Sequence, residues 1–346
     1  MTAIEVLSGG LNGLVEYLSL HVIGCLVPAL FIAGAISAFA SQSTILKYFG
    51  PEAKKPLAYA IGSITGTVLA VCSCTVLPLF AGIYKRGAGL GPAIAFLYSG
   101  PAINILAIVY TANILGYDLG VARAVGAVTF SMVIGLIMAF IFRKDEAQKL
   151  QSAFATATAD CQENTKKPWV YGLFFGVLLA ILLTAARRLW LPLGILGAIL
   201  GIVLWRWFTS EELKEWLRET GFFLKKIIPW LLIGVFIAGI LGVVIPPEGM
   251  ARFMGGNTLL GNFIASLGGA LMYIATLTEV PIVKTFLNLG MGNGPALALL
   301  LAGPALSLPA MLTLRGIMGG KKTAVYVALV VVAATVTGLI FGALNR

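Results

Sequence analysis

The chain has 346 residues, of which 59% are hydrophobic and only 11% are charged, and its mean hydropathy is +0.97. A soluble globular chain carries about 25% charged residues, so this chain has too few charges to cover a water-exposed surface. The composition excludes a cytosolic enzyme and a nucleic-acid-binding domain, and it indicates an all-α polytopic membrane protein. The net charge of +10 then predicts orientation in the bilayer, because Lys and Arg gather on the cytoplasmic side.

Ten apolar segments approach or exceed the roughly 20 residues that cross the hydrocarbon core of a bilayer. They are Tyr17–Ala40, Leu57–Tyr84, Pro92–Leu115, Ala124–Phe142, Trp169–Ala186, Leu189–Trp205, Ile227–Ile245, Leu259–Leu287, Pro295–Leu314 and Ala324–Ala343. The second and the eighth are interrupted by polar residues and a proline. If these two are re-entrant hairpins, the chain has about eight spanning helices plus two hairpins; if they cross, it has ten spans.

The placement of basic residues favours the hairpins. Lys54 and Lys55 precede the first interrupted segment and Lys85 and Arg86 follow it, and all four are cytoplasmic only if the segment returns to the side it entered. The same topology places most other basic residues inside and the N-terminus outside. The exceptions are Arg123, Arg187, Arg188, Arg252, Lys284 and Arg346.

An internal repeat follows each interrupted segment. Gly87–Ala102 reads GAGLGPAIAFLYSGPA, Gly290–Ala305 reads GMGNGPALALLLAGPA, and ten of these 16 positions are identical at an offset of 203. The hairpin topology makes the two copies inverted, which is typical of secondary transporters whose solute sites lie at interrupted helices. We therefore expect a first repeat at 1–142, a cytoplasmic loop and linking helix pair at 143–208, and an amphipathic helix with the second repeat at 209–346.

The amphipathic helix is predicted to begin at Thr209, where Thr209-Ser-Glu-Glu212 forms a capping-box pattern. Its spacing directs Leu213, Trp216 and Leu217 toward lipid.

The tip of the first hairpin carries Cys72, Ser73, Cys74 and Thr75, shortly before Pro78. Two thiols two positions apart lie on one side of an extended backbone. Thiolates are soft ligands that suit trivalent metalloids better than Na⁺ or Mg²⁺. We expect these four residues to bind solute, with Cys72 and Cys74 as ligands of a metalloid. The alternative, that the cysteines are small buried hydrophobic residues, stays open.

The second tip carries Thr278 and Glu279 before Pro281. An ionisable side chain at membrane depth is costly and usually functional. We expect Thr278 to contact solute and Glu279 to carry a proton, because loss of water favours the uncharged form of a carboxyl group. The alternative is a buried ion pair between Glu279 and Lys284.

The helices after the hairpins are broken again at Gly100-Pro101 and Gly303-Pro304, and Asn104 and Ser307 follow at equivalent positions. Such breaks free backbone groups that can face a solute, although a kink needed only for packing explains them equally. The sequence has no Walker A, HExxH or strand-linked GxGxxG motif. We therefore expect neither an enzyme nor an ATP-driven transporter, and no cofactor.

With these residues in view, the chain resembles the ArsP-like family of predicted permeases. The resemblance rests on Cys72-Ser-Cys-Thr-Val-Leu-Pro78, Gly82-Ile-Tyr-Lys-Arg-Gly87 and Phe96-Leu-Tyr-Ser-Gly-Pro-Ala-Ile-Asn104, and extends over most of the chain. It implies an inner-membrane efflux permease for trivalent organoarsenicals such as methylarsenite.

The leading prediction is thus a secondary permease of the inner membrane that exports a small soft solute in exchange for protons. Its partners are the solute and the lipid bilayer, without nucleic acid, and a homo-oligomer is left open. Two other functions remain: a transmembrane thiol–disulfide conduit using Cys72 and Cys74, and a passive channel for a small solute. A conduit through both halves would need a thiol in each repeat, and only the first repeat carries the pair.

Overall fold

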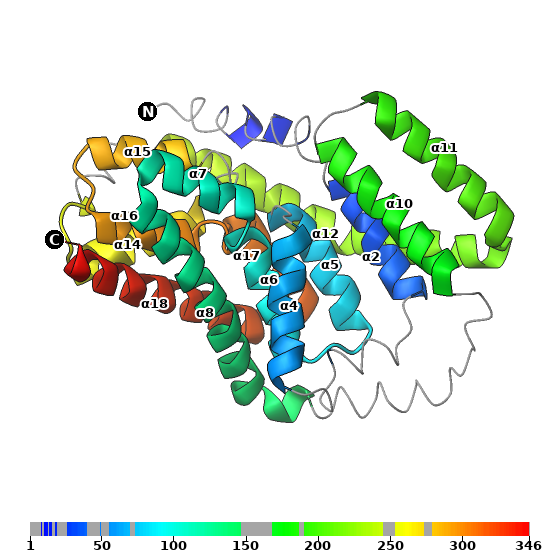
Figure 1. Ribbon diagram of the computed structural model, residues 1–346, viewed down its shortest axis with the longest axis horizontal. Coiled ribbons are helices and arrows are strands. Elements are labelled where there is room, and N and C mark those ends of the chain that lie inside the picture. Colours follow the sequence, from blue (N-terminus) through cyan, green and yellow to red (C-terminus); the bar gives the residue numbers. More distant parts are fainter. Residues whose placement is uncertain are drawn as a thin grey trace.

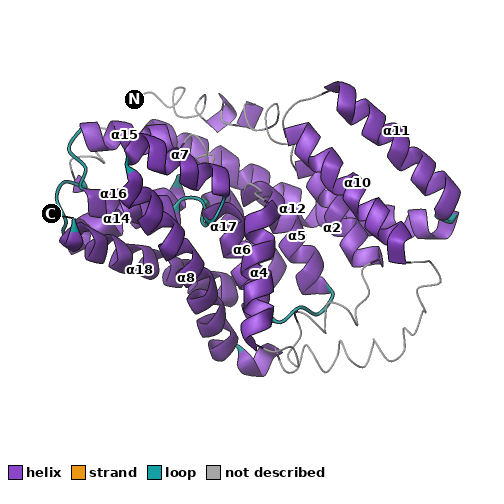
Figure 2. Cartoon of the chain, viewed as in Figure 1, coloured by secondary structure: helices purple, strands orange, loops and turns teal. Residues whose placement is uncertain are grey.

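The computed structural model describes residues 8, 10–12, 14–15, 18, 26–39, 49, 55–69, 73–146, 168–186, 190–244, 253–272 and 279–345. Within these residues every extended regular element is a helix (Figures 1 and 2). The helices are α2 (Val27–Phe39), α4 (Lys55–Leu69), α5 (Ser73–Lys85), α6 (Leu90–Ala102), α7 (Ile105–Leu115), α8 (Tyr117–Ile141), α10 (Pro168–Ala186), α11 (Trp190–Trp207), α12 (Ser210–Val244), α14 (Leu259–Leu271), α15 (Glu279–Asn288), α16 (Asn293–Ala302), α17 (Leu308–Met318) and α18 (Gly320–Leu344).

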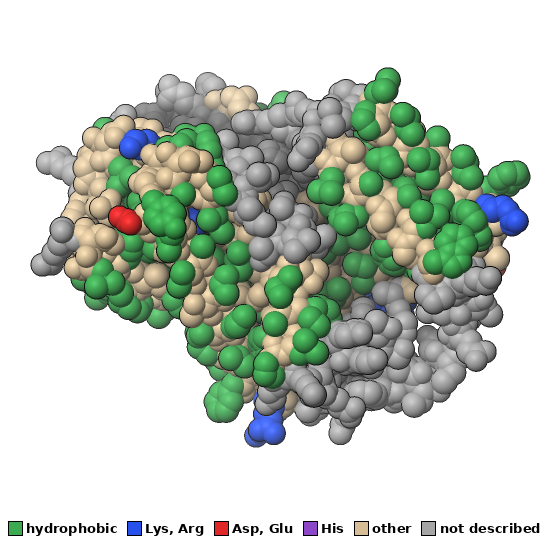
Figure 3. All heavy atoms as spheres, in the orientation of Figure 1, with side chains coloured by type: hydrophobic (Ala, Val, Ile, Leu, Met, Phe, Trp, Pro, Cys, Tyr) green, Lys and Arg blue, Asp and Glu red, His purple; other side chains and the backbone are tan. Residues whose placement is uncertain are grey.

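Several of these helices are suited to a bilayer. Tyr117–Ile141, Ser210–Ile240 and Gly320–Leu344 are each long and apolar enough to cross it, and α6 with α7 forms a fourth candidate that is bent by 45°. Six further apolar helices of 10–17 residues lie in the described part of the chain. Figure 3 shows hydrophobic side chains over most of the visible surface of α8, α10 and α11, with few charged ones. The predictions of an all-helical fold and of several apolar, membrane-length helices are therefore confirmed for the described residues.

The amphipathic segment differs from the prediction. It is continuous with the span that follows, so that α12 is one helix of 35 residues. The capping box forms as expected, because the Glu212 carboxylate accepts from the Thr209 backbone N–H at 2.7 Å. Trp216, which we expected to face lipid, is buried, and its indole N–H donates to the Phe31 carbonyl of α2 at 2.8 Å. Helix α2 packs along α12, and this contact encloses Trp216, whereas Leu217 stays exposed.

Each interrupted segment returns to the place where it began. The Gly89 N–H, after α5, donates to the Phe49 carbonyl, before α4, at 2.7 Å. In the second half the Gly292 N–H, after α15, donates to the Met254 carbonyl, before α14, at 3.0 Å. The residues that flank each helix pair are therefore joined by a backbone hydrogen bond.

The two halves correspond closely at the offset of 203. Helices α17 and α18 begin and end 203 residues after α7 and α8. Gly87 and Gly290 both have positive φ, 96° and 101°, as do Gly116 and Gly319, 112° and 89°. These are backbone conformations that only glycine adopts without strain. The same turns thus end the hairpins and begin the long helices in both halves.

Packing repeats as well. Helix α6 lies between α4 and α8, and α16 lies between α14 and α18. Ser63 of α4 and Ser131 of α8 are hydrogen-bonded at 2.8 Å, and Ser266 of α14 and Thr335 of α18 at 3.0 Å. Each pair lies within one half, and the two pairs join corresponding helices, α4 with α8 and α14 with α18.

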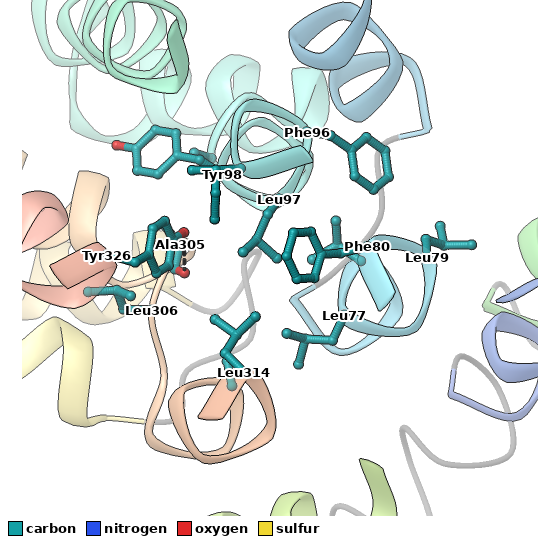
Figure 4. Packing of buried hydrophobic residues seen from close by; sticks show 14 of the residues in the cluster. Leu77, Leu79, Phe80, Phe96, Leu97, Tyr98, Ala305, Leu306, Leu314 and Tyr326 are labelled. Atoms are coloured by element: carbon teal, nitrogen blue, oxygen red, sulfur yellow. Dashed lines mark hydrogen bonds between the residues drawn. The ribbon is translucent and has the colours of Figure 1, made fainter. Parts of the chain in front are cut away.

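The halves meet in an apolar core that Figure 4 shows from close by. In Figure 4, Leu97 of α6 points toward Phe80 of α5, and the ring of Tyr98 extends to the side on which Tyr326 and Leu306 of the second half lie. The Tyr98 hydroxyl donates to the Leu301 carbonyl at 3.4 Å. Residue 301 is the counterpart of residue 98 at the offset of 203, so these helices contact each other at equivalent positions.

Charged side chains collect at the end of the molecule near the first hairpin base. The Glu146 carboxylate accepts from the Tyr84 hydroxyl at 2.9 Å, the Lys322 ammonium at 2.8 Å and the Leu90 backbone N–H at 3.2 Å. Glu219 of α12 accepts from Ser37 at 2.6 Å and forms an ion pair with Lys85. Residues predicted to be cytoplasmic from separate parts of the chain, including Lys85 and Lys322, are therefore held in polar contacts near the first hairpin and its neighbours.

Glycine contacts between helices give a stability prediction. A Cβ at Gly135 of α8 would lie 2.7 Å from the Gly91 carbonyl oxygen of α6, so Gly135→Ala must push the two backbones apart. We expect a loss of about 1–3 kcal/mol, as in overpacked cores. Gly172 of α10 has no atom within 4 Å of an added Cβ, so Gly172→Ala is the matched control and gains up to about 1 kcal/mol in helix propensity. Thermal unfolding of the purified variants in detergent measures both, and equal midpoints would contradict this packing.

Candidate functional site

A fully buried ion pair joins the two halves of the molecule. Nη2 of Arg123 in α8 lies 3.0 Å from Oε2 of Glu279 in α15, and their side chains are 0% and 2% exposed. Nη1 of Arg123 donates to the Thr111 hydroxyl of α7 at 2.9 Å, and that hydroxyl donates to the Ala107 carbonyl. The pair therefore links the second hairpin to two helices of the first half.

Local sequence explains how both charges reach this depth. Helix α8 begins at Tyr117, after the turn at Gly116, so Arg123 lies almost two turns inside the helix. Glu279 is the first residue of α15 and is buried together with Val280 and Val283. Because α15 packs against α7 and α16, the start of the helix is enclosed by protein on these sides.

The pair uses only part of its hydrogen-bonding capacity. Nε of Arg123 and Oε1 of Glu279 are both buried and have no hydrogen-bond partner among the described residues. A guanidinium group commonly binds a carboxylate through two parallel bonds, whereas here one is formed. Oε1 lies against the helix break after α16, since a Cβ at Gly303 would be 2.6 Å from it. Gly303 thus lets the carboxylate approach the interrupted helix closely.

This charged pair has no equivalent at the matching place in the other half. At the offset of 203, Arg123 corresponds to Tyr326 and Glu279 corresponds to Val76, both of which are buried. The Tyr326 hydroxyl donates to the Ala305 carbonyl at 3.4 Å. At this matching position, therefore, the second hairpin carries a buried ion pair and the first carries the buried apolar side chain of Val76, although the helices around them correspond.

The other predicted site residues are placed as follows. Cys72 and Thr278 lie outside the described residues, and Ser73 and Cys74 begin α5 without described side chains. Thr75 is buried in α5, and Asn104 is buried between α6 and α7.

Ser307 is buried at the start of α17, where its hydroxyl accepts from the Ala310 N–H at 3.3 Å. This helix cap is a structural role for Ser307. Among the described residues, no three His, Cys, Asp or Glu side chains gather into a metal-binding group.

The partner of Glu279 differs from the one that sequence suggested. Lys284 is exposed, and the ion pair is formed by Arg123. Sequence analysis placed Arg123 just before a span that was expected to begin at Ala124. The internal repeat contained a signal that Arg123 lies inside the helix. At the offset of 203, Arg123 corresponds to Tyr326, which lies inside the predicted span Ala324–Ala343.

An all-helical chain with membrane-length apolar helices, interrupted hairpins and a buried charge pair defines a multi-pass membrane protein. Residues 8–343 match the ArsP-like family described as "Predicted permease", and the chain belongs to this family. The predicted resemblance is confirmed, and the family description indicates a transporter of small solutes rather than an enzyme.

Curated relatives carry only provisional names. The chain is 45% identical over 354 residues to the UPF0718 protein MJ0584 of Methanocaldococcus jannaschii, covering 97% of this chain and 96% of that protein. It is 26% identical over 281 residues to the UPF0718 protein YraQ of Escherichia coli, covering 80% and 66% of the two chains. No solved structure matches the chain.

The ion pair makes a testable prediction about stability. Removing one partner leaves the other charge buried and uncompensated, so Glu279→Gln and Arg123→Met are each expected to cost about 3–5 kcal/mol. The double variant Arg123→Met/Glu279→Gln loses less than the sum, because it buries no charge. Thermal unfolding in detergent measures this cycle, with exposed Lys284→Gln as the control. Strictly additive losses would show that the two side chains are not coupled.

Proposed function

We propose that this protein is a secondary-active permease that exports a small soft solute in exchange for protons. Trivalent organoarsenicals are the solute class that the family resemblance implies. The observation that supports the proposal is the buried Arg123–Glu279 pair, because its carboxylate lies where the second hairpin meets the first half. The proposal includes an inner-membrane location with the N-terminus outside.

The architecture proposed for transport is a pair of inverted repeats, within 1–142 and 209–346, with eight spanning helices and two re-entrant hairpins. Three observations support it: the hairpin bases are closed by backbone hydrogen bonds, the long helices correspond at a constant offset, and α6 and α7 meet at a 45° bend. Non-helical backbone at membrane depth is tolerated where protein or a water-filled cavity surrounds it. We therefore propose that the solute passes at the hairpin tips and the helix breaks.

The solute is held, in this proposal, by the first tip and by the polar residues of the breaks. Cys72 and Cys74 bind its soft centre, and Ser73, Thr75 and Asn104 contact it from the same half. Thr278 and Ser307 contribute from the other half. Position supports this assignment: Cys74 is the second residue of α5, and Asn104 lies in the gap between the two parts of the broken span.

Proton exchange follows from the charge pair. While Glu279 is ionised it is bound to Arg123, and the second hairpin is tied to α7 and α8. A proton on Glu279 removes the attraction that holds this contact. Proton uptake and hairpin movement are thereby coupled, as a secondary transporter requires.

Transport by everted membrane vesicles tests the function. We expect methylarsenite uptake that depends on an imposed proton gradient and is lost in Cys72→Ser/Cys74→Ser. Glu279→Gln is expected to lose at least about 90% of gradient-driven uptake, because its amide does not exchange protons. Cys161→Ser, in the polar loop between the halves, is the control and should transport normally. Undiminished uptake in both site variants would refute the assignment, and no uptake by the unmodified protein would remove arsenicals as substrates.

Cysteine labelling tests the hairpin topology. In a cysteine-free background, Lys55→Cys at the start of α4 and Lys85→Cys at the end of α5 are expected to react with a membrane-impermeant maleimide from the cytoplasmic side only. Tyr117→Cys, beyond the broken span, should react from the outside. Labelling of positions 55 and 85 from opposite sides would instead establish the ten-span alternative.

A further inference from the structure

The Arg123 guanidinium uses only part of its hydrogen-bonding capacity in the core of the molecule. A guanidinium group binds an oxyanion best through Nε and one Nη, which point in the same direction. In Arg123, Nη1 is bound to Thr111 and Nη2 to Glu279, while Nε has no acceptor among the described residues. The edge that is suited to an oxyanion is therefore half used by Glu279, through a single oxygen.

Glu279 is the residue that gives Arg123 its negative counter-charge. A guanidinium group does not lose its proton in proteins, and a buried charge without a counter-ion is strongly unfavourable. Once Glu279 carries a proton, Nη2 and Nε of Arg123 both lack an anionic acceptor. Some other negative charge must then approach the guanidinium, or water must reach it.

We propose that Arg123 is an anion-binding residue that becomes available when Glu279 takes up a proton. The ligand is a small oxyanion, carboxylate-like in shape, with two oxygens that accept from Nε and Nη2. The proton comes from water and binds the carboxylate, the Arg123–Glu279 bond breaks, and the anion restores neutrality. This inference rests on the proton uptake proposed for Glu279 and adds a second requirement, a negatively charged group that enters with the proton.

Few other groups near Arg123 could replace Glu279 as its negative counter-charge. Tyr98 of α6 is buried and close enough to Arg123 to interact with it electrostatically, but its hydroxyl donates to the Leu301 carbonyl. Asp118 on α8, Tyr110 on α7 and Lys284 on α15 are all exposed. Helix α16, which packs against α15, has no titratable residue between Asn293 and Ala302.

The proposed exchange requires the solute and the proton to bind alternately, so the anion that binds Arg123 is a small ion separate from the exported solute. One proton and one negative charge then bind together, so that no net charge is added to the core.

Anion rescue of a destabilised variant tests the proposal. Glu279→Gln leaves the Arg123 charge without its counter-ion, as protonation does. We expect nitrate or acetate to raise its thermal midpoint by about 3 °C relative to the same concentration of gluconate, which is too bulky for the core. Unmodified protein should show this response more strongly at acidic than at alkaline pH, because a proton on Glu279 removes the same counter-charge.

The controls separate binding at Arg123 from a general salt effect. The double variant Arg123→Met/Glu279→Gln has no buried charge and should respond equally to nitrate and gluconate at every pH. Lys284→Gln, which removes an exposed cation from the same helix, should behave as the unmodified protein. If folded Glu279→Gln responds no more to nitrate than to gluconate, the proposal is overturned. A nitrate response that persists in the double variant also overturns it, because the anion then binds elsewhere.

The same measurement distinguishes this inference from the proposed export function. Nitrate rescue of Glu279→Gln depends only on Arg123 and needs no transport. Absent methylarsenite uptake with intact rescue would refute arsenical export and leave the anion site standing. Gradient-driven methylarsenite uptake without nitrate rescue would support arsenical export and refute the anion site.

Discussion

The constraint on which the rest of the structure depends is the absence of water in the hydrocarbon core. Each backbone polar group and each charge placed there must find its partner inside the protein. Arg123 and Glu279 meet this requirement for charge, since each supplies what the other needs. Because these partners lie far apart in sequence, satisfying them also brings the two halves together.

The two halves share a framework and differ in chemistry at one place. Matched turns at Gly87 and Gly290, and matched long helices, hold the two hairpins against equivalent neighbours. One position of this framework carries Val76 near an apolar core, and its counterpart carries Glu279 paired with Arg123. In the proposed function, the repeated framework offers two related conformations and Glu279 connects them to a proton gradient. The Arg123–Glu279 pair, which has no counterpart in the other half, is therefore where we propose that proton uptake is coupled to movement.

A second set of polar contacts lies away from the ion pair. Glu146 joins Tyr84 of the first hairpin to Lys322 at the start of α18, and it also accepts from the first N–H of α6. This carboxylate thus satisfies a helix N-terminus and neutralises a lysine at once. Together with the Lys85–Glu219 ion pair, which joins α5 to α12, it fastens one end of the interface between the halves, whereas the Arg123–Glu279 pair fastens its interior.

Much of the fold was available from the sequence because it depends on composition, periodicity and repetition. Hydrophobic length predicted membrane helices, Gly-Pro pairs predicted the breaks, and the offset of 203 predicted which elements would correspond. Glu279 could be singled out by its charge alone, since an acid amid apolar residues requires an explanation. Tertiary structure decided its partner. Lys284 was near in sequence but lies on an exposed face, and Arg123 became the partner because packing of α15 against α7 brings residues 156 positions apart within hydrogen-bonding distance. The same reason turned Trp216 inward: the direction of a side chain follows from which helix packs against it, and local spacing does not contain that information.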